Sequence, residues 1–275
     1  MYITNGDKYS RICGLCKPDD QLETGELKPR GSHFCRSSML LLMASLVWPP
    51  PAPAFDHSYQ NYAAALSECV REGRVDYARL CRERAGLDQF LGEASVLSFE
   101  EYQTFSREQK MAFMMNLYNA GALALVCNHP GMKSIEELKG VFRDAWSVRF
   151  IRLFDRTVGL AQLLHDILRP EFKDTRIHFA LVTACKSDPE LLNVPYRAEI
   201  LNQHLDRQTE KFMTERPDAN RYENGTLYLS PKSRWDAVDF GRRGQLLRFA
   251  QRYFAEVTEQ KPVRYTSFDW SLNAK

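Results

Sequence analysis

The longest helical pattern in the chain is also its most apolar. It covers residues 107–127, and apolar side chains occupy nearly every face of that helix from Ala112 to Val126. A helix that is apolar all round has no face to present to solvent, so other parts of the protein must surround it. The sequence therefore predicts a buried central helix against which the remaining elements pack.

The flanking segments predict further helices and only short strands. Apolar residues recur at helical spacing over 58–72, 79–91, 160–168, 198–213 and 245–257. Alternation predicts a hairpin over 147–158, and β-like runs cover 176–184 and 226–230. Strands and helices do not alternate as they do in βαβ units. We therefore expect an α+β fold: a mostly helical single domain with a small antiparallel sheet packed against the central helix.

An apolar run near the N-terminus is typical of a cleaved signal peptide. Arg36 precedes the apolar run 39–48, three prolines end it, and Ala52-Pro53-Ala54 forms a cleavage site of the small-x-small type. The run is well short of the roughly 20 residues that a membrane-spanning helix needs, so we expect no stable membrane anchor. We predict an over-extended, unstructured start at 1–38, a signal peptide at 39–54 and a single α+β domain at 55–275. Cleavage near Ala54 would make the protein periplasmic or secreted.

The net charge and the cysteine content bear on which partners and cofactors we expect. The formal net charge is only +2, which gives no electrostatic case for nucleic acid. In an oxidising compartment the cysteines after residue 54 can form disulfides, and Cys69 with Cys81, twelve residues apart across a turn, is the pair we expect first. The single Cys-x-x-Cys at 13–16 has no second pair and no histidine partners, so we predict no metal and no cofactor.

Three weak constellations hold the candidate chemistry, because the sequence contains no phosphate-binding glycine loop and no established hydrolase motif. The first joins His178, on the β-like run 176–184, to Cys185 just past its end. A thiol beside an imidazole can form a thiolate nucleophile with histidine as its base. An extended run would separate the two by roughly 23 Å, so the pair requires the loop to fold back. The alternative is a core-lining histidine and a buried free cysteine.

The other two constellations are pairs on helices. Asn116 and Asn119 are three residues apart, so both lie on one face of the central helix. Buried amides need partners, and these two either support a neighbouring loop or line a polar cleft. His165 and Arg169 are four apart and could together hold an anionic group such as a carboxylate, or they form a solvated helix face.

Several short segments, in a fixed order, resemble a known family. They are Phe55-Asp56-His57-Ser58, Gly73-Arg74-Val75-Asp76-Tyr77, NLYNA at 116–120, LLHDILRP at 163–170, IHFAL at 177–181, and Trp235 with Asp239-Phe240. In this order they resemble the family numbered 547 among the domains of unknown function, over about residues 55–255. The resemblance implies an exported bacterial protein and brings no assigned reaction.

The chain departs from the pattern of that family at four positions. Thr183 and Asp188 stand where the family has two cysteines, and Cys185 stands where it has serine. The joint loss of two cysteines implies a missing structural disulfide rather than a missing nucleophile. Leu164 stands where the family tends to have glutamate, so any acid or base supplied by that glutamate is absent here.

Two hypotheses of different class follow. In the first, the exported protein has a polar cleft and is a thiol- or histidine-dependent hydrolase or transferase acting on peptide-like substrates, with His178 as base and Cys185 as nucleophile. Asn116 and Asn119 orient groups, and His165 with Arg169 binds a carboxylate of a small-molecule or peptide ligand. In the second, it is a non-catalytic periplasmic binding or scaffold domain, a degenerate family member. Whether the chain is an enzyme stays open, and so does its oligomeric state.

Overall fold

The computed structural model describes residues 54–138 and 145–275, which belong to one compact unit of the chain. The start predicted at 1–38 and the signal peptide predicted at 39–54, apart from Ala54 itself, lie outside the described residues. Within the described ranges, no helix has the length and apolar character needed to cross a membrane.

The described chain is mostly helical with short strands, as expected for the fold class. The helices of its first half are α2 (Gln60–Cys69), α3 (Tyr77–Arg82), α4 (Ala85–Val96), α5 (Phe99–Thr104) and α6 (Arg107–Cys127). Those of its second half are α7 (Leu160–Gln162), α8 (Arg169–Phe172), α9 (Leu201–Thr214), α10 (Lys232–Trp235), α11 (Ala237–Phe240) and α12 (Arg243–Gln251). A π-helical turn, Leu163–Leu168, joins α7 to α8, and 3₁₀ turns cover Ile135–Leu138, Ala145–Ser147, Thr175–Phe179 and Ala198–Ile200.

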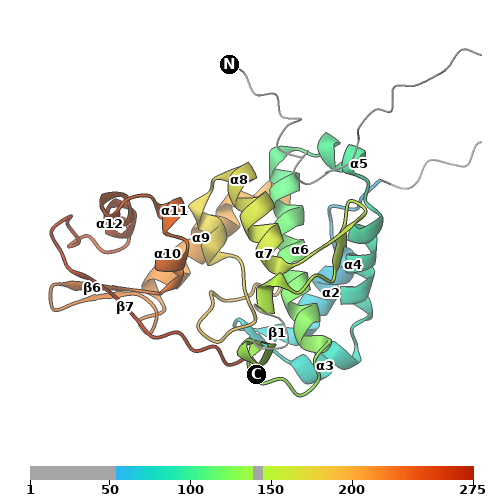
Figure 1. The fold of residues 1–275 in the computed structure, drawn as a ribbon, viewed down its shortest axis with the longest axis horizontal. Helices are drawn as coiled ribbons and strands as arrows, with labels where there is room; N and C mark the ends of the chain where they lie inside the picture. The colour runs from blue at the N-terminus through green and yellow to red at the C-terminus, as the bar shows by residue number, and fades with distance from the viewer. Residues whose placement is uncertain (1–53, 139–144) are drawn as a thin grey trace, which may run out of the picture. The chain divides into compact units, whose positions relative to one another are not determined.

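Helix α6 is the buried central helix that its sequence predicts. It begins with a capping box, in which the Ser106 hydroxyl accepts from the Gln109 N–H and the Gln109 side chain accepts from the Ser106 N–H. Every residue from Met111 to Cys127 is buried. Figure 1 shows α6 with α2 and α4 on one side and α7 and α8 on the other. The predicted central position of this helix is therefore confirmed.

The disulfide expected between Cys69 and Cys81 is wrong. Cys81 on α3 is bonded to Cys127 at the end of α6, with their Cα atoms 5.0 Å apart, while Cys69 is buried and free. Helix α3 packs against α6, so the two cysteines meet across a helix contact. Cys69, at the end of α2, takes no part in this bond.

Within the described residues the strands form three separate small sheets rather than the single antiparallel one expected. Antiparallel hairpins are made by β1 (Val70–Arg71) with β2 (Arg74–Val75), and by β3 (Ile151–Leu153) with β4 (Arg156–Val158). The latter confirms the hairpin predicted within 147–158. The third sheet holds β5 (Arg221–Glu223), β6 (Thr226–Leu229) and β7 (Val263–Tyr265), and its β6–β7 pairing is parallel.

The run 176–184 is not the strand that we predicted. The Asp174 carboxylate caps the 3₁₀ helix Thr175–Phe179 by accepting from the Arg176 N–H, and an irregular segment follows. Asn119, rather than a neighbouring strand, satisfies backbone groups of Ala180 and Val182. The predicted helix at 79–91 is likewise interrupted and forms α3 and α4.

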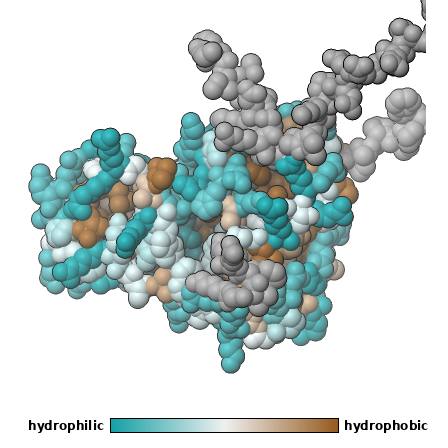
Figure 2. All heavy atoms as spheres, viewed as in Figure 1, coloured by the Kyte–Doolittle hydropathy of each residue, from teal (hydrophilic) through white to brown (hydrophobic). Residues whose placement is uncertain are grey.

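A second group of apolar side chains lies beyond the α6 core, in the C-terminal part of the unit. It is contributed mainly by the 3₁₀ helix after Asp174, α9, β6, α11 and α12, and consists of Phe179, Phe212, Met213, Ala219, Leu227, Leu229, Phe240, Leu246, Leu247, Phe249, Ala250 and Val257. On the face drawn in Figure 2, hydrophilic residues cover most of the described surface. Phe179, next to His178, belongs to this second group, and Asn119 of α6 hydrogen-bonds the backbone that follows it.

Candidate functional site

Asn116 and Asn119 each hold a neighbouring backbone segment. The Asn116 amide donates to the Tyr196 carbonyl at 2.8 Å and accepts from the Tyr196 N–H at 2.9 Å. Asn119 donates to the Ala180 carbonyl and accepts from the Val182 N–H, both at 3.0 Å. Both amides are buried, and each uses its oxygen and its nitrogen on the backbone of an irregular segment. This arrangement fits the supporting role better than the cleft-lining role.

His178 lies between two carboxylates. It is 2% exposed, its Nε2 is 2.7 Å from Asp239 Oδ2, and its Nδ1 is 3.2 Å from Asp236 Oδ2. Burial lowers the pKa of His178, but the hydrogen bonds to the two carboxylates raise it by more, so the net shift is upward. With an acceptor on each nitrogen, the favoured species is the imidazolium, which donates from both. A histidine held this way is not a ready base.

Arg169 completes the cluster. Its Nε donates to Asp239 Oδ2, and its Nη1 lies 3.8 Å from Asp236 Oδ1. His165 Nδ1 is 2.6 Å from Arg169 Nη1, so the predicted pair is in contact. Burial raises the pKa of Asp239, but the hydrogen bonds from His178 and Arg169 lower it to about 2. The guanidinium that was predicted to bind a ligand carboxylate is therefore engaged by carboxylates of the chain itself.

The two aspartates were not foreseen as site residues. Asp236 follows α10 and Asp239 lies on α11, the latter 61 positions after His178. Asp239-Phe240 does appear among the segments that carry the resemblance, and this was the available signal. Ligand atoms of His178, Asp236 and Asp239 lie within 4.8 Å of one another, a spacing that could hold a metal ion. Arg169 and the His178 imidazolium already balance both carboxylates, so the cluster fits an ion-pair network better than a metal centre.

Cys185 is in an environment that disfavours a thiolate. It is 1% exposed, and its Sγ lies 3.4 Å from Thr183 Oγ1 and 3.5 Å from the Thr183 carbonyl oxygen. Burial, with the Asp188 carboxylate nearby, raises the pKa of the Cys185 thiol well above its usual value. Both nitrogens of His178 are occupied by aspartates. The structure therefore does not form the His178–Cys185 pair, and a catalytic role for either residue stays a prediction.

The two positions at which the resemblance implies cysteines are in contact. Asp188 Oδ2 accepts from the Thr183 N–H at 2.6 Å, from the Thr183 hydroxyl at 2.8 Å and from the Cys185 N–H at 2.9 Å. Asp188 Oδ1 is 2.8 Å from the ammonium of Lys232, and the Asp188 side chain has no exposed area. A polar contact thus joins the positions that a disulfide would join.

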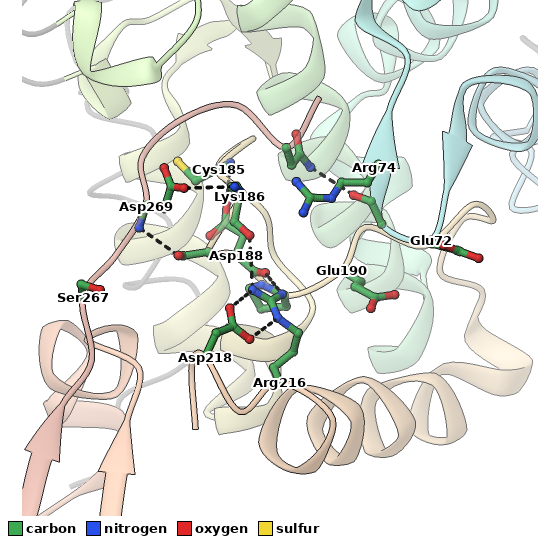
Figure 3. Close-up of a pocket in the computed structure, with 14 residues that line it drawn as sticks. Glu72, Arg74, Cys185, Lys186, Asp188, Glu190, Arg216, Asp218, Ser267 and Asp269 are labelled. Carbon is green, nitrogen blue, oxygen red and sulfur yellow. Dashed lines mark hydrogen bonds and ion pairs between the residues drawn. The ribbon is translucent and has the colours of Figure 1, made fainter. Parts of the chain in front are cut away.

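A pocket of about 510 Å³ lies beside this loop. Its wall comes from the β1–β2 turn (72–74), the loop 185–190, the segment after α9 with Arg216 and Asp218, and the C-terminal stretch 267–273 (Figure 3). Of the six site residues predicted from sequence, Cys185 alone contributes to this wall. The pocket was missed because its segments are far apart in the chain.

Hydrogen bonds between distant segments and one close approach at Gly73 hold the wall together. Arg216 donates to the carbonyls of Asp188 and Lys186 and pairs with Asp218 at 2.7 Å. Gly73 adopts φ +73°, and a Cβ there would lie 2.7 Å from the Glu190 side chain, so only glycine permits this close approach. The loop and the C-terminal stretch are joined by backbone hydrogen bonds, for example from the Lys186 N–H to the Ser271 carbonyl at 2.8 Å.

Successive side chains of the C-terminal stretch lie in two different environments. Ser267 and Asp269 line the pocket, whereas Phe268 and Trp270 pack on Trp235, with ring centroids 5.0 and 5.2 Å away respectively. Successive side chains of an extended segment point to opposite faces. The stretch is therefore anchored by aromatic packing on one face and presents polar groups to the pocket on the other.

Comparison with protein families gives a match over part of the chain. No curated protein and no solved structure matches the chain. A family model matches residues 102–213, a shorter span than the 55–255 expected from the sequence. That span contains the six predicted site residues and Asp188 but not Lys232, Asp236 or Asp239. Over residues 102–213 the chain resembles the family described as "Protein of unknown function, DUF547".

Proposed function

We propose that this chain is an exported, non-catalytic binding domain that takes a small polar molecule in the pocket beside the loop 185–190. The observation that carries the proposal is the pocket itself. A volume of about 510 Å³ is within the range of small-molecule sites, and hydrogen bonds between distant segments preform its wall. In this account the His178 cluster and the two asparagines hold the fold together.

Export is supported by a bonded cysteine pair and by the sequence of residues 39–54. The Cys81–Cys127 disulfide is the kind of bond that persists in an oxidising compartment and is rare in the cytosol. The apolar run and the small-x-small site before Phe55 are typical of a secretory signal. A periplasmic or secreted location is accordingly part of the proposal.

A screen on the full-length chain tests the proposal. Thermal unfolding would be followed with a panel of amino acids, dipeptides and dicarboxylic acids, because a ligand that binds only the folded state raises the unfolding temperature. Ser267→Trp, at an exposed position in the wall, should fill the pocket and remove the stabilisation. Gln260→Trp, exposed and outside the pocket, should keep it.

Two results would contradict the proposal. One is stabilisation of equal size in Ser267→Trp and in the unaltered chain, because the ligand would then bind elsewhere. The other is a panel in which no compound stabilises the chain.

A histidine-dependent hydrolase is the second candidate, favoured by one observation. His165, Arg169 and His178 do meet in a single cluster, and its Asp239 side chain is 22% exposed, so the cluster reaches solvent. For His178 to act as a base in this cluster, it must lose its hydrogen bond to either Asp236 or Asp239. Turnover of a dipeptide p-nitroanilide that is lost in His178→Ala but kept in His204→Ala would favour this candidate. Absence of turnover in the unaltered chain favours the binding domain.

A further inference from the structure

Among the interactions of residues 54–138 and 145–275, one basic side chain of the pocket has no partner. Of its basic residues, Arg216 is paired with Asp218 at 2.7 Å and Lys186 is near Asp269 at 3.5 Å. Among the residues that the structure describes, the Arg74 guanidinium makes no hydrogen bond and no ion pair. In Figure 3 the Arg74 side chain extends from the β1–β2 hairpin toward the interior of the pocket. It is partly buried there.

The acids of the wall, by contrast, are nearly all neutralised. The pairs are Asp188 with Lys232 at 2.8 Å, Glu190 with Lys211 at 2.7 Å, Asp218 with Arg216 and Asp269 with Lys186. Glu72 is exposed and points away from the pocket in Figure 3. The uncompensated charge that faces the interior is therefore the positive charge of Arg74.

We propose that Arg74 binds a carboxylate group of the ligand, with Lys186 as a second contact. This inference rests on the proposed function, because it names the chemistry that the same pocket recognises. A guanidinium binds a carboxylate through two parallel hydrogen bonds. The Lys186–Asp269 pair joins side chains that are 50% and 48% exposed, and such pairs are weak, so the ammonium can turn to a ligand.

The charge of the wall selects a carboxylate over a phosphate. A phosphate group carries close to two negative charges at neutral pH, whereas four of the five acids of the wall are already paired and only Arg74, among the described residues of the wall, offers an unpaired guanidinium. One free guanidinium is matched to a single negative charge. The carboxylate can belong to a free organic acid or to the C-terminus of a peptide, and both fit a pocket of about 510 Å³.

Titration calorimetry with paired probes tests the inference on the full-length chain. The probes are succinate and its diamide, and the dipeptide Ala-Ala and its C-terminal amide, with inorganic phosphate as a further arm. Loss of a hydrogen-bonded ion pair weakens binding by roughly tenfold to a hundredfold. We expect that loss on going from carboxylate to amide, and also on going from the unaltered chain to Arg74→Gln. The tighter of succinate and Ala-Ala identifies the source of the carboxylate.

Arg71→Gln is the matched control. Arg71 is the cross-strand partner of Arg74 on the same hairpin but is exposed and does not line the pocket, so its loss changes the net charge equally and should leave affinity unchanged. Arg74→Lys, which keeps the positive charge, should recover part of the affinity that Arg74→Gln loses. Equal binding of acids and amides, equal loss in both glutamine variants, or tighter binding of phosphate would overturn the carboxylate assignment while the binding domain stands. No binding of any probe would reject both.

Discussion

The hydroxyl of Thr183 donates to one oxygen of the Asp188 carboxylate at 2.8 Å, and the ammonium of Lys232 lies 2.8 Å from the other oxygen. The contact shows how this loop keeps its shape without the two cysteines that the resemblance implies at the same positions. Asp188 accepts from three donors of the loop through one oxygen and pairs with a lysine through the other. The same loop supplies one wall of the pocket.

Removal of Lys232 should destabilise the fold. Lys232→Met leaves the buried Asp188 carboxylate without its cation, which typically costs about 3–5 kcal/mol. Urea unfolding monitored by circular dichroism measures the loss. Lys211→Met, which breaks the more exposed Lys211–Glu190 pair, should cost less than about 1 kcal/mol. Equal losses in the two variants would mean that Asp188 is not held as described.

Stability should depend on pH through His178. The pKa of His178 is raised in the folded chain, so its contribution is fully present below the unfolded pKa of about 6.5 and is lost as pH rises through the folded value. The free energy of unfolding, compared between the unaltered chain and His178→Gln from about pH 5 to about pH 9, should therefore differ most at the acidic end.

His204 provides a control, because its effect on stability should change with pH in the opposite direction. Burial and nearby Arg207 lower the pKa of His204, so its protonation opposes folding, and its penalty disappears as pH rises. His204→Gln should gain stability relative to the unaltered chain at the acidic end. A His178→Gln profile parallel to that of the unaltered chain would show that the two aspartates do not hold an imidazolium.

Loss of the disulfide should be costly. It closes a loop with a sequence separation of 46 residues, and such bonds typically contribute about 2–4 kcal/mol. We expect that decrease in the free energy of unfolding for the double variant Cys81→Ser with Cys127→Ser. Cys69→Ser, at a buried free cysteine, should cost less. Mass spectrometry that finds Cys69 bonded to Cys81 would contradict the structure directly.

Replacement of Asn119 should lower the stability of the fold more than the affinity for a ligand. Asn119→Ala leaves the buried Val182 N–H without a partner, at about 1–3 kcal/mol, and removes one of the two donors to the Ala180 carbonyl. Asn128→Ala, at the exposed end of α6, serves as the comparison and should cost less than about 0.5 kcal/mol. Unchanged stability of Asn119→Ala would remove its supporting role.

Cys185 should react slowly with iodoacetamide. Its thiol is 1% exposed with a raised pKa, and alkylation requires an accessible thiolate. The rate, measured against pH with Cys13, Cys16, Cys35 and Cys69 replaced by serine, should rise only under unfolding conditions. Rapid alkylation at neutral pH would restore the thiol-dependent enzyme as the leading account.

Structural features that depend on residues close together in the sequence could be predicted. The apolar pattern of α6 determines a buried helix wherever it lies, and the Asp155-Arg156 turn with flanking alternation marks the β3–β4 hairpin. Features set by distant segments were not predictable. The apolar run after Arg176 is compatible with a strand as well as with an irregular segment. The hydrogen bonds of Asn119 to its backbone, which come from a distant helix, favour the irregular segment.

The candidate site follows the same division. His165 and Arg169 were paired correctly because four residues along a helix bring side chains together. The aspartates around His178 and the partner of Cys81 come from elements far along the chain, and no local pattern marks them. The pocket escaped notice because Arg74, Arg216 and Asp269 share a wall only after folding.

Mapping of a bound ligand by NMR tests the central claim most directly. The backbone amide signals of the full-length chain would be followed while the tightest-binding carboxylate is added. The account predicts shifts concentrated at 72–74, 185–190, 216–218 and 267–273, the segments of the pocket wall. Shifts centred instead on His165, Arg169 and Asp239 would contradict it and would identify the histidine cluster as the functional site.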